Sequence, residues 1–542
     1  MRSVFVLLIL SGVTRLFAQD QGGIPDVEIQ IVNPLKVILP KAERNFIKVP
    51  ALPLEPITPP IVYDYSLVSF SAPSFSPAVR PLRIKPTEDQ TVYPSFVSAG
   101  FGNFSSPYLR GYLSFFPSKS TTVGGLSFYH NSFGNGPIDG KNSSGGFSSI
   151  SANIKASNNT VTTEALAGFE NRSANFYGYD GALKAKKDTI KQSYSTFFVS
   201  GKVSNSKKSN FNYMFRPSFS YLTDKYEAKE SDLSFDFNSS YQMKGHLALV
   251  FNSSYSLIAR KDSAIEAKPR HLFRVMPQYQ FSPIQNLIVR AGLNVVFEND
   301  SIGKKGMHVY PAASSTFSLG KNFGLFASLS GDMEKVSLHT LSRENVWLNS
   351  RISIYHTNKI LDFSGGIRGD LGSGFGFMSG FAFARLKNLY FFKNSSTNQA
   401  KFDALYDDVI RTNFFASIHF DKGNYSFRIK GDYYTYSMDI LATAWHRPKY
   451  RLDSYLVIKA ADKLSIVPRL MVLGGLKAYD HVTAREVLLP TAIDLSASLE
   501  YNFSGKAGMF LKFNNLLADS YSLYYRYPVR SFQAMAGFTW KF

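Results

Sequence analysis

The chain of 542 residues contains no cysteine, and only 18% of its residues are charged. The absence of cysteine excludes a disulfide scaffold and a cysteine-ligated zinc site. Soluble proteins contain about 25% charged residues, so the low charge content argues against an ordinary soluble surface. After its first residues the chain also lacks an apolar run of about 20 residues, the length that a membrane-spanning helix requires. The mean hydropathy of -0.11 agrees with that exclusion.

Aromatic residues are abundant instead, at 15% of the chain, with 47 Phe and 31 Tyr. This much apolar surface excludes disorder over most of the length. A chain rich in Phe and Tyr but of middling hydropathy is typical of a protein whose alternate residues face lipid and water.

The net charge is +20, from 60 Lys and Arg against 40 Asp and Glu. A nucleic-acid-binding protein gathers its basic residues into a patch or stripe. Here they occur one or two at a time along the whole chain, so no nucleic-acid partner is expected.

The first 18 residues have the pattern of a signal peptide. Arg2 supplies a positive start, residues 4–10 form a short apolar core, and Ala18 ends a plausible cleavage site before Gln19. Removal of residues 1–18 takes away Arg2 and Arg15, which leaves a mature charge of 20 - 2 = +18.

Residues 19–91 form a proline-rich arm. Thirteen of the 25 prolines lie between Pro25 and Pro94. Proline removes a backbone donor and fixes φ, so an extended arm is predicted rather than helix or central strand. The arm either hangs in the periplasm or docks in a larger structure, and its aliphatic and aromatic residues between 57 and 75 favour docking.

Residues 92–542 alternate with period two, which places apolar and polar side chains on opposite faces of strands. In the clearest example, apolar residues occupy every second position: Ile493, Leu495, Ala497, Leu499, Tyr501 and Phe503. The runs often reach ten residues, the length of a tilted membrane-spanning strand. In lipid every backbone amide must be paired, so the strands must close into a barrel. About 20 residues per strand and connection predict an all-β, antiparallel transmembrane β-barrel of about 22 strands. Four longer polar segments are expected as extracellular loops: 133–146, 172–188, 334–350 and 479–490.

Five residues on the polar faces are expected to point into the lumen: Arg290, Arg428, Lys430, Asp432 and Lys512. Basic side chains in a pore favour anions. Any water-filled barrel, however, has a polar lining, and positive charge also complements lipopolysaccharide.

No catalytic, cofactor or metal site is predicted, and the chain is not expected to be an enzyme. The nine histidines are dispersed, and none lies in a His-Glu-x-x-His arrangement. His446 is interpreted as a strand-end or turn residue rather than as a ligand. Residues 372–376, Gly-Ser-Gly-Phe-Gly, are interpreted as a hairpin turn because alternating strands flank them on both sides.

Several segments near the carboxyl end resemble the closing strands of TonB-dependent receptor barrels. They are residues 444–448 (Ala-Trp-His-Arg-Pro), 510–517 (Phe-Leu-Lys-Phe-Asn-Asn-Leu-Leu), 524–529 (Tyr-Tyr-Arg-Tyr-Pro-Val) and the aromatic-ended tail from Phe532. The segment 93–103 at the start of the barrel is similar as well. The likeness is to barrels of the Bacteroidetes type that lack an ordinary plug domain. It implies a multi-pass barrel in the outer membrane of a Gram-negative bacterium that binds or takes up a solute.

The chain departs from that family before the barrel. Receptors of the family carry a plug of well over a hundred residues there, whereas the arm 19–91 is shorter and too rich in proline to form one. Val27, Ile29 and Ile31 faintly resemble a TonB box, although any exported arm contains such a run. The expected partners are outer-membrane lipid, lipopolysaccharide and, through residues 19–91, TonB or another envelope protein; the small-molecule ligand is unknown. The alternative function is a non-transporting structural or accessory subunit of an outer-membrane complex.

Overall fold

The computed structural model describes residues 95–115, 122–138, 140–179, 185–243, 245, 247–262, 268–300, 306–349 and 351–542. The predicted signal peptide (1–18) and the predicted arm (19–91) lie outside the described residues. Among the described residues, no helix is both long enough and apolar enough to cross a membrane.

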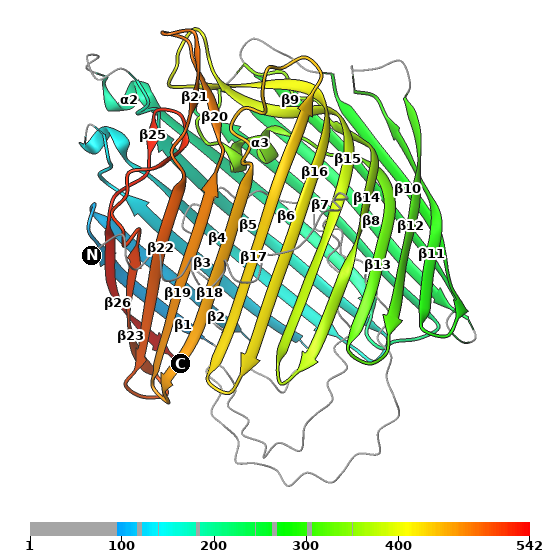
Figure 1. Cartoon of the computed structure of the whole chain (residues 1–542). Helices are drawn as coiled ribbons and strands as arrows, with labels where there is room; N and C mark the ends of the chain where they lie inside the picture. Colours follow the sequence, from blue (N-terminus) through cyan, green and yellow to red (C-terminus); the bar gives the residue numbers. More distant parts are fainter. Residues whose placement is uncertain are drawn as a thin grey trace, which may run out of the picture.

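The described chain forms one closed, 22-stranded antiparallel sheet (Figure 1). Each strand pairs with its neighbour along the chain, and β1 pairs with β26 to close the ring. The predicted all-β barrel of about 22 strands is therefore confirmed. Its strands are β1 (Phe96–Gly102), β2 (Ser106–Phe115), β3 (Thr122–Phe133), β4 (Gly145–Ser157), β5 (Val161–Asn175), β6 (Lys191–Asn205), β7 (Phe211–Asp224), β8 (Lys229–Gln242), β9 (Ala248–Lys261), β10 (Arg270–Ile284), β11 (Leu287–Glu298), β12 (Met307–Leu319), β13 (Phe323–Glu334), β14 (Thr357–Gly372), β15 (Phe375–Asn394), β16 (Phe402–Lys422), β17 (Tyr425–Met438), β18 (Tyr450–Ala461), β19 (Leu464–Gly474), β22 (Ala492–Asn502), β23 (Ala507–Asn514) and β26 (Gln533–Lys541).

The outer face of the barrel is apolar. Leu495 pairs with Leu470 on one face of β22 and β19, while Ser496 pairs with Arg469 on the other. Large apolar side chains such as Phe538 (68% exposed) and Trp540 (55%) project from the outside. Such a surface is stable only against lipid, and the closed ring leaves no unpaired strand edge. The barrel therefore spans a membrane.

The two ends of the barrel differ. One end, the turn end, has short connections such as 285–286, 373–374 and 423–424. Ser373 (φ 54°) and Gly374 (φ 80°) both adopt the left-handed backbone that a two-residue hairpin turn requires, as predicted for residues 372–376. The chain terminus at Phe542 also lies at this end (Figure 1).

The opposite end, the loop end, carries the long connections and the small elements within them. The four segments predicted as extracellular loops all lie there. Long loops on one side and short turns on the other are the pattern of outer-membrane barrels, whose loops face outward from the cell. The small elements are η1 (Gly140–Ser143), α2 (Lys187–Ile190), α3 (Leu338–Glu344), β20 (Lys477–Asp480), β21 (Arg485–Leu488), β24 (Ser522–Tyr524) and β25 (Tyr527–Pro528).

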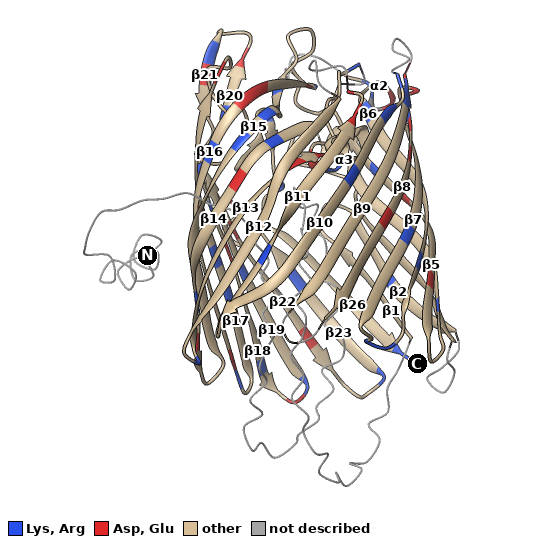
Figure 2. Cartoon of the chain, turned by 90° about the vertical axis from the view of Figure 1, so that its right-hand side faces the viewer, with Lys and Arg blue, Asp and Glu red and all other residues tan. Residues whose placement is uncertain are grey.

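Not all of these loops extend away from the barrel. The loop 335–356 folds inward, so α3 lies within the outline of the barrel in both views (Figures 1 and 2). The β20–β21 hairpin instead extends beyond the wall (Figure 1). The inward-folded loops give the lumen a roof.

Candidate functional site

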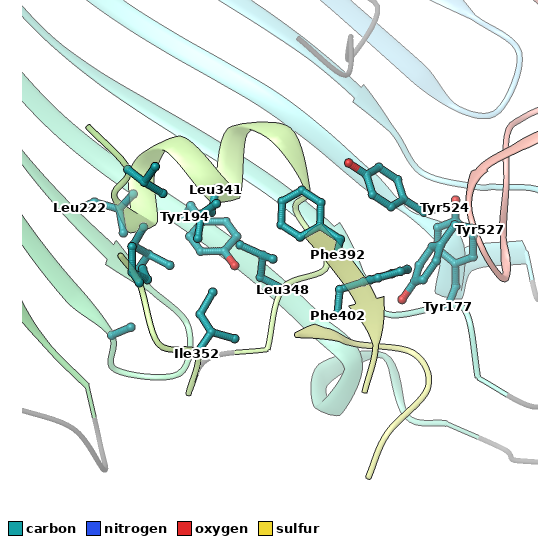
Figure 3. Close-up of a cluster of buried hydrophobic side chains, with 14 residues drawn as sticks. Tyr177, Tyr194, Leu222, Leu341, Leu348, Ile352, Phe392, Phe402, Tyr524 and Tyr527 are labelled. Atoms are coloured by element: carbon teal, nitrogen blue, oxygen red, sulfur yellow. The ribbon is translucent and has the colours of Figure 1, made fainter. Parts of the chain in front are cut away.

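The roof, which we call the lid, consists of the loops 335–356, 439–449 and 515–532 together with the loop-end parts of β15 and β16. Its core is a cluster of buried apolar side chains from elements far apart in the sequence (Figure 3). The cluster contains Tyr177, Tyr194, Leu222, Ala228, Val336, Leu338, Leu341, Leu348, Ile352, Ile354, Phe392, Phe402, Tyr524 and Tyr527. Burial of this size makes the lid a small hydrophobic core inside the barrel mouth.

Aromatic contacts join the separate loops of the lid. The Trp347 ring stacks on Tyr527 with 4.0 Å between ring centroids, and Tyr177 meets the same Tyr527 ring at 4.7 Å. The Trp347 indole N–H donates to the Asn175 carbonyl at 3.0 Å, and the Tyr177 hydroxyl donates to the Pro528 carbonyl at 3.2 Å. Each ring thus has both apolar contact and a partner for its polar atom, which holds the loops in one arrangement.

A buried ion pair links the lid to the tall strand β15. The Glu344 carboxylate, at the end of α3, accepts from the Arg447 guanidinium at 3.1 Å and from the Tyr390 hydroxyl at 2.5 Å. Arg447 also donates to the Tyr390 carbonyl at 2.8 Å, and the Tyr524 hydroxyl donates to the Glu344 carbonyl at 3.0 Å. Removing one partner would leave the other charge buried without compensation, so the pair keeps α3 in its place.

His446 is a structural part of the lid. Its Nδ1 lies 2.7 Å from the Phe392 carbonyl and its Nε2 accepts from the Tyr525 amide at 3.2 Å. These contacts require a neutral ring with the proton on Nδ1. Burial lowers the pKa of His446 to about 4, and burial together with the nearby Arg270 lowers the pKa of His356 to about 3. Both rings are therefore neutral at pH 7.

Below the lid lies a chamber of about 1040 Å³. Its wall is one continuous arc of neighbouring strands, which runs from β16 to β19 through β22, β23 and β26 and then from β1 to β5. Arg343, Glu344, Trp347, Tyr524 and Tyr527 of the lid form its ceiling. The lumen of this barrel thus holds a large cavity roofed by its own loops.

Basic side chains predominate in the chamber lining. Eight basic residues line it, against three acidic residues, Glu344, Asp453 and Asp494. The basic residues are Arg172, Arg343, Arg428, Lys430, Arg451, Arg469, Lys512 and Arg530. Positive charges that gather in a low-dielectric cavity concentrate their field there and attract anions.

The basic side chains of the lining differ in what they contact. Arg428 lies 2.6 Å from Asp421, and Arg451 forms an ion pair with Asp453. Lys512 instead lies over the Tyr108 ring, 4.0 Å from its centroid. Arg172 similarly lies 5.1 Å from the Phe147 centroid, and Arg530 donates to two backbone carbonyls. The contacts named for these three residues are thus with ring faces and backbone carbonyls, which are favourable partners for a cationic group.

The structure brings three of the five sequence-predicted lumen residues together. Arg428, Lys430 and Lys512 line the chamber, and Asp432 lies beside Lys430 at 3.5 Å. Arg290 occupies the same face of β11 as Asn294 but lies outside the chamber lining, where it donates to Gln280 at 2.8 Å. The weak TonB-box residues Val27, Ile29 and Ile31 lie outside the described residues.

The residues that form the ceiling of the chamber were not predicted from the sequence. Arg343, Glu344 and Arg530 lie in loops without periodicity, so alternation gave no sign that they face the lumen. Their position depends on contacts between loops, such as the bond from Arg530 to the Asn135 carbonyl at 3.0 Å. Within the described ranges, no cluster of three or more His, Asp or Glu residues is arranged to hold a metal ion.

No protein-family model matches the sequence, and no curated protein matches it. Solved structures do match the fold. The siderophore receptor PiuA from Acinetobacter baumannii superimposes with a TM-score of 0.63 at 10% identity, covering 84% of this chain and 82% of that one. The FrpB iron transporter from Neisseria meningitidis gives 0.65 at 10% identity, with 84% and 82% covered. The ferripyoverdine receptor of the outer membrane of Pseudomonas aeruginosa gives 0.62 at 12% identity, with 85% and 73% covered.

The chain has the fold of these receptors. Identities of 10 to 12% establish the architecture and nothing further about ligand or partner. The 22-stranded ring, the lipid-facing exterior and the asymmetry between turns and loops place the chain in the outer membrane. The loop end faces the outside of the cell, and the turn end faces the periplasm.

Proposed function

We propose that this chain binds an anionic solute in its chamber and takes part in solute uptake across the outer membrane. The observation that carries the proposal is the chamber of about 1040 Å³, whose lining has eight basic against three acidic residues. Similarity of fold to a siderophore receptor and to an iron transporter supports a receptor role. Aromatic rings such as Tyr108 and Trp347 beside the cationic groups favour an anion with apolar parts, such as a metal chelate.

The finer assignments belong to the same proposal. The segments near the carboxyl end support a relation to Bacteroidetes-type barrels without an ordinary plug. Residues 1–18 would direct export, and Val27, Ile29 and Ile31 would pair with TonB as an added strand. Solute from outside would have to pass the lid, so uptake requires the lid loops to move.

Binding of two probes that differ in charge tests the proposal. Purified full-length protein is titrated with ferric citrate, an anionic chelate, and with ferrichrome, a neutral one, while Trp fluorescence is followed. We expect saturable binding of the anion. Replacing Arg428 and Lys512 with Gln should weaken it about 10-fold or more, since a hydrogen bond to a charged group contributes about 1.5–3 kcal/mol.

Arg290→Gln is the matched control, because Arg290 faces the interior outside the chamber lining. Its affinity for the anion should equal that of the unchanged protein. Equal affinity for the neutral and the anionic chelate, or equal effects of the chamber and control variants, would contradict the proposal.

The buried core of the lid favours a second candidate, an accessory barrel that does not transport. A hydrophobic cluster across the loop end is typical of a closed structure rather than of an open pore. Single-channel recording separates the two. A barrel that neither conducts nor binds the anionic probe, and that copurifies with a stoichiometric envelope protein, would fit the accessory role.

A further inference from the structure

We propose that the lumen contains a second binding site, which takes a zwitterionic solute of the amino-acid class. The site is a cavity of about 430 Å³ on the inner wall formed by β6 to β10 (Figure 2), beside the start of the lid loop at Lys335. None of its lining residues belongs to the lining of the chamber. The inference therefore stands apart from the anionic solute proposed for the chamber.

Most of the charged groups of this cavity neutralise one another. Lys335 forms an ion pair with Asp232, with 2.7 Å between the ammonium nitrogen and the carboxylate oxygen. Arg274 forms an ion pair with Asp332, also at 2.7 Å. These pairs hold one side of the cavity in a fixed arrangement. Of the five charged residues in the lining, two are left outside them.

The two remaining charged residues are Arg216 on β7 and Asp236 on β8. They are direct cross-strand partners on the inner face, yet they form no ion pair with each other. The Arg216 guanidinium donates to the Met214 sulfur at 3.8 Å. The Asp236 carboxylate has no hydrogen-bond or ion-pair partner in the described part of the chain. One positive and one negative group are thus available next to each other.

Cross-strand charges on the neighbouring strands do pair. Glu164 on β5 lies opposite Lys155 of β4 and Lys202 of β6, and its carboxylate forms ion pairs with both, at 3.6 and 3.3 Å. Arg216 and Asp236 have the same relation in register without the contact. Because the Cα atoms of cross-strand partners lie about 4.5–5.5 Å apart, the two side chains can reach opposite charges on adjacent parts of one small ligand.

An α-amino acid fits these two groups. Its carboxylate would accept from the Arg216 guanidinium and its ammonium would donate to the Asp236 carboxylate, so that every charge is paired. A solute with a single charge would leave one of the two side chains without a partner. The preference differs from that of the chamber, whose excess of basic residues favours anions.

The rest of the cavity can hold the side chain of the ligand. The hydroxyls of Ser200, Ser218 and Ser220 belong to the lining and make no hydrogen bond within the described residues. A hydroxyl both donates and accepts, so these three suit an amide or a hydroxyl on the ligand. Phe198 adds an aromatic ring to the same lining. The cavity volume of about 430 Å³ lies within the range of small-molecule sites, about 300–1,000 Å³.

Isothermal titration calorimetry of the purified full-length protein tests the site. Each of the twenty standard amino acids is titrated, and the one that binds best is compared with its N-acetyl derivative and its α-amide. The first derivative lacks the ammonium, and the second lacks the carboxylate. We expect the amino acid to bind about 10-fold or more tightly than either derivative, since each derivative loses hydrogen bonds between charged groups.

Two uncharged variants assign the roles of the charged side chains. Asp236→Asn should abolish the preference for the amino acid over its N-acetyl derivative and keep the preference over the α-amide. Arg216→Gln should do the opposite. The preference that each variant keeps shows that its cavity is still folded. Arg290→Gln, on the inner face outside this lining, is the matched control and should keep both preferences.

The proposal would be overturned if none of the twenty amino acids binds, or if the amino acid and both derivatives bind equally well. Variants at 216 and 236 that behave like Arg290→Gln would overturn it as well. So would glucose, which offers hydroxyls without charge, if it bound as tightly as the best amino acid. These outcomes are independent of whether the chamber binds ferric citrate, because Arg216 and Asp236 are not part of the chamber lining.

Discussion

The wall of the barrel and its lid are built by different rules. In the wall, neighbouring strands pair in register, and the position of a residue in the alternation decides whether it faces lipid or lumen, as Leu495 and Ser496 show. In the lid, contacts join residues such as Trp347 and Tyr527 or Glu344 and Arg447, which belong to different loops. The apolar side chains of the wall face lipid, whereas those of the lid are buried within the protein. The same substitution should therefore have different effects in the two regions.

The largest difference is expected between two phenylalanines of the same strand, β16. Phe402 is fully buried in the lid against Tyr524 and Tyr527, with ring centroids at 5.3 and 5.8 Å. Phe402→Ala should destabilise the lid by about 3–5 kcal/mol, since it leaves a cavity. Phe414→Ala, on the lipid-facing side, should cost much less because lipid fills the space. Urea unfolding in lipid vesicles measures both, and equal losses would mean that the lid is not a packed core.

Charge insertion probes the alternation of the wall. Leu495→Arg on β22 should destabilise the barrel by about 2–4 kcal/mol, because it places a charge in lipid. Ser496→Arg should have little effect, since Ser496 lines the chamber beside Asp494 and its hydroxyl donates to that carboxylate at 2.5 Å. The same unfolding experiment applies. Similar losses at the two positions would show that β22 does not separate lipid from lumen.

Acid should loosen the lid before the wall. With the lid open, His446 takes up a proton near its ordinary pKa of about 6.5; with the lid closed, it does so only near pH 4. The closed lid is thus fully stable above about pH 6.5 and loses up to about 3 kcal/mol as the pH falls to about 4. Trp347, stacked in the lid, reports the change by its fluorescence.

His446→Gln provides the control for acid loosening, because glutamine keeps a donor and an acceptor but does not titrate. The variant should lose part of the pH dependence, with the remainder due to His356. A pH profile identical to that of the unchanged protein would exclude His446 as the cause.

The smallest effect is expected at a partly exposed ion pair of the β20–β21 hairpin. Lys477 and Glu486 form an ion pair at 2.7 Å, with side chains 28% and 41% exposed. Lys477→Ala should reduce stability by only about 0.2–1 kcal/mol, and the effect should fade at high salt. A thermal melt at two salt concentrations checks this. A loss comparable to that of Phe402→Ala would show that the Lys477–Glu486 pair contributes far more than a surface ion pair.

Much of the wall could be predicted because its information is local. Alternation along Ile493–Phe503 and the turn residues near Ser373 identify strand faces and connections without knowledge of the partner strand. The same alternation assigned Arg428, Lys430 and Lys512 to the polar face, and the structure places all three in the chamber lining. Arg290 was placed on the same kind of face, but alternation does not say which part of the lumen a strand borders.

The sequence by itself determined a membrane barrel of about 22 strands, because period two, strand length and the need to pair every amide are properties of single segments. Only the tertiary structure decided that the loop end is roofed and that a basic chamber lies beneath it. Glu344 meets Arg447 across 103 positions, and Tyr524 meets Glu344 across 180. Such contacts leave no periodic trace in the sequence, because loops are positioned by packing against one another rather than by a repeating backbone geometry.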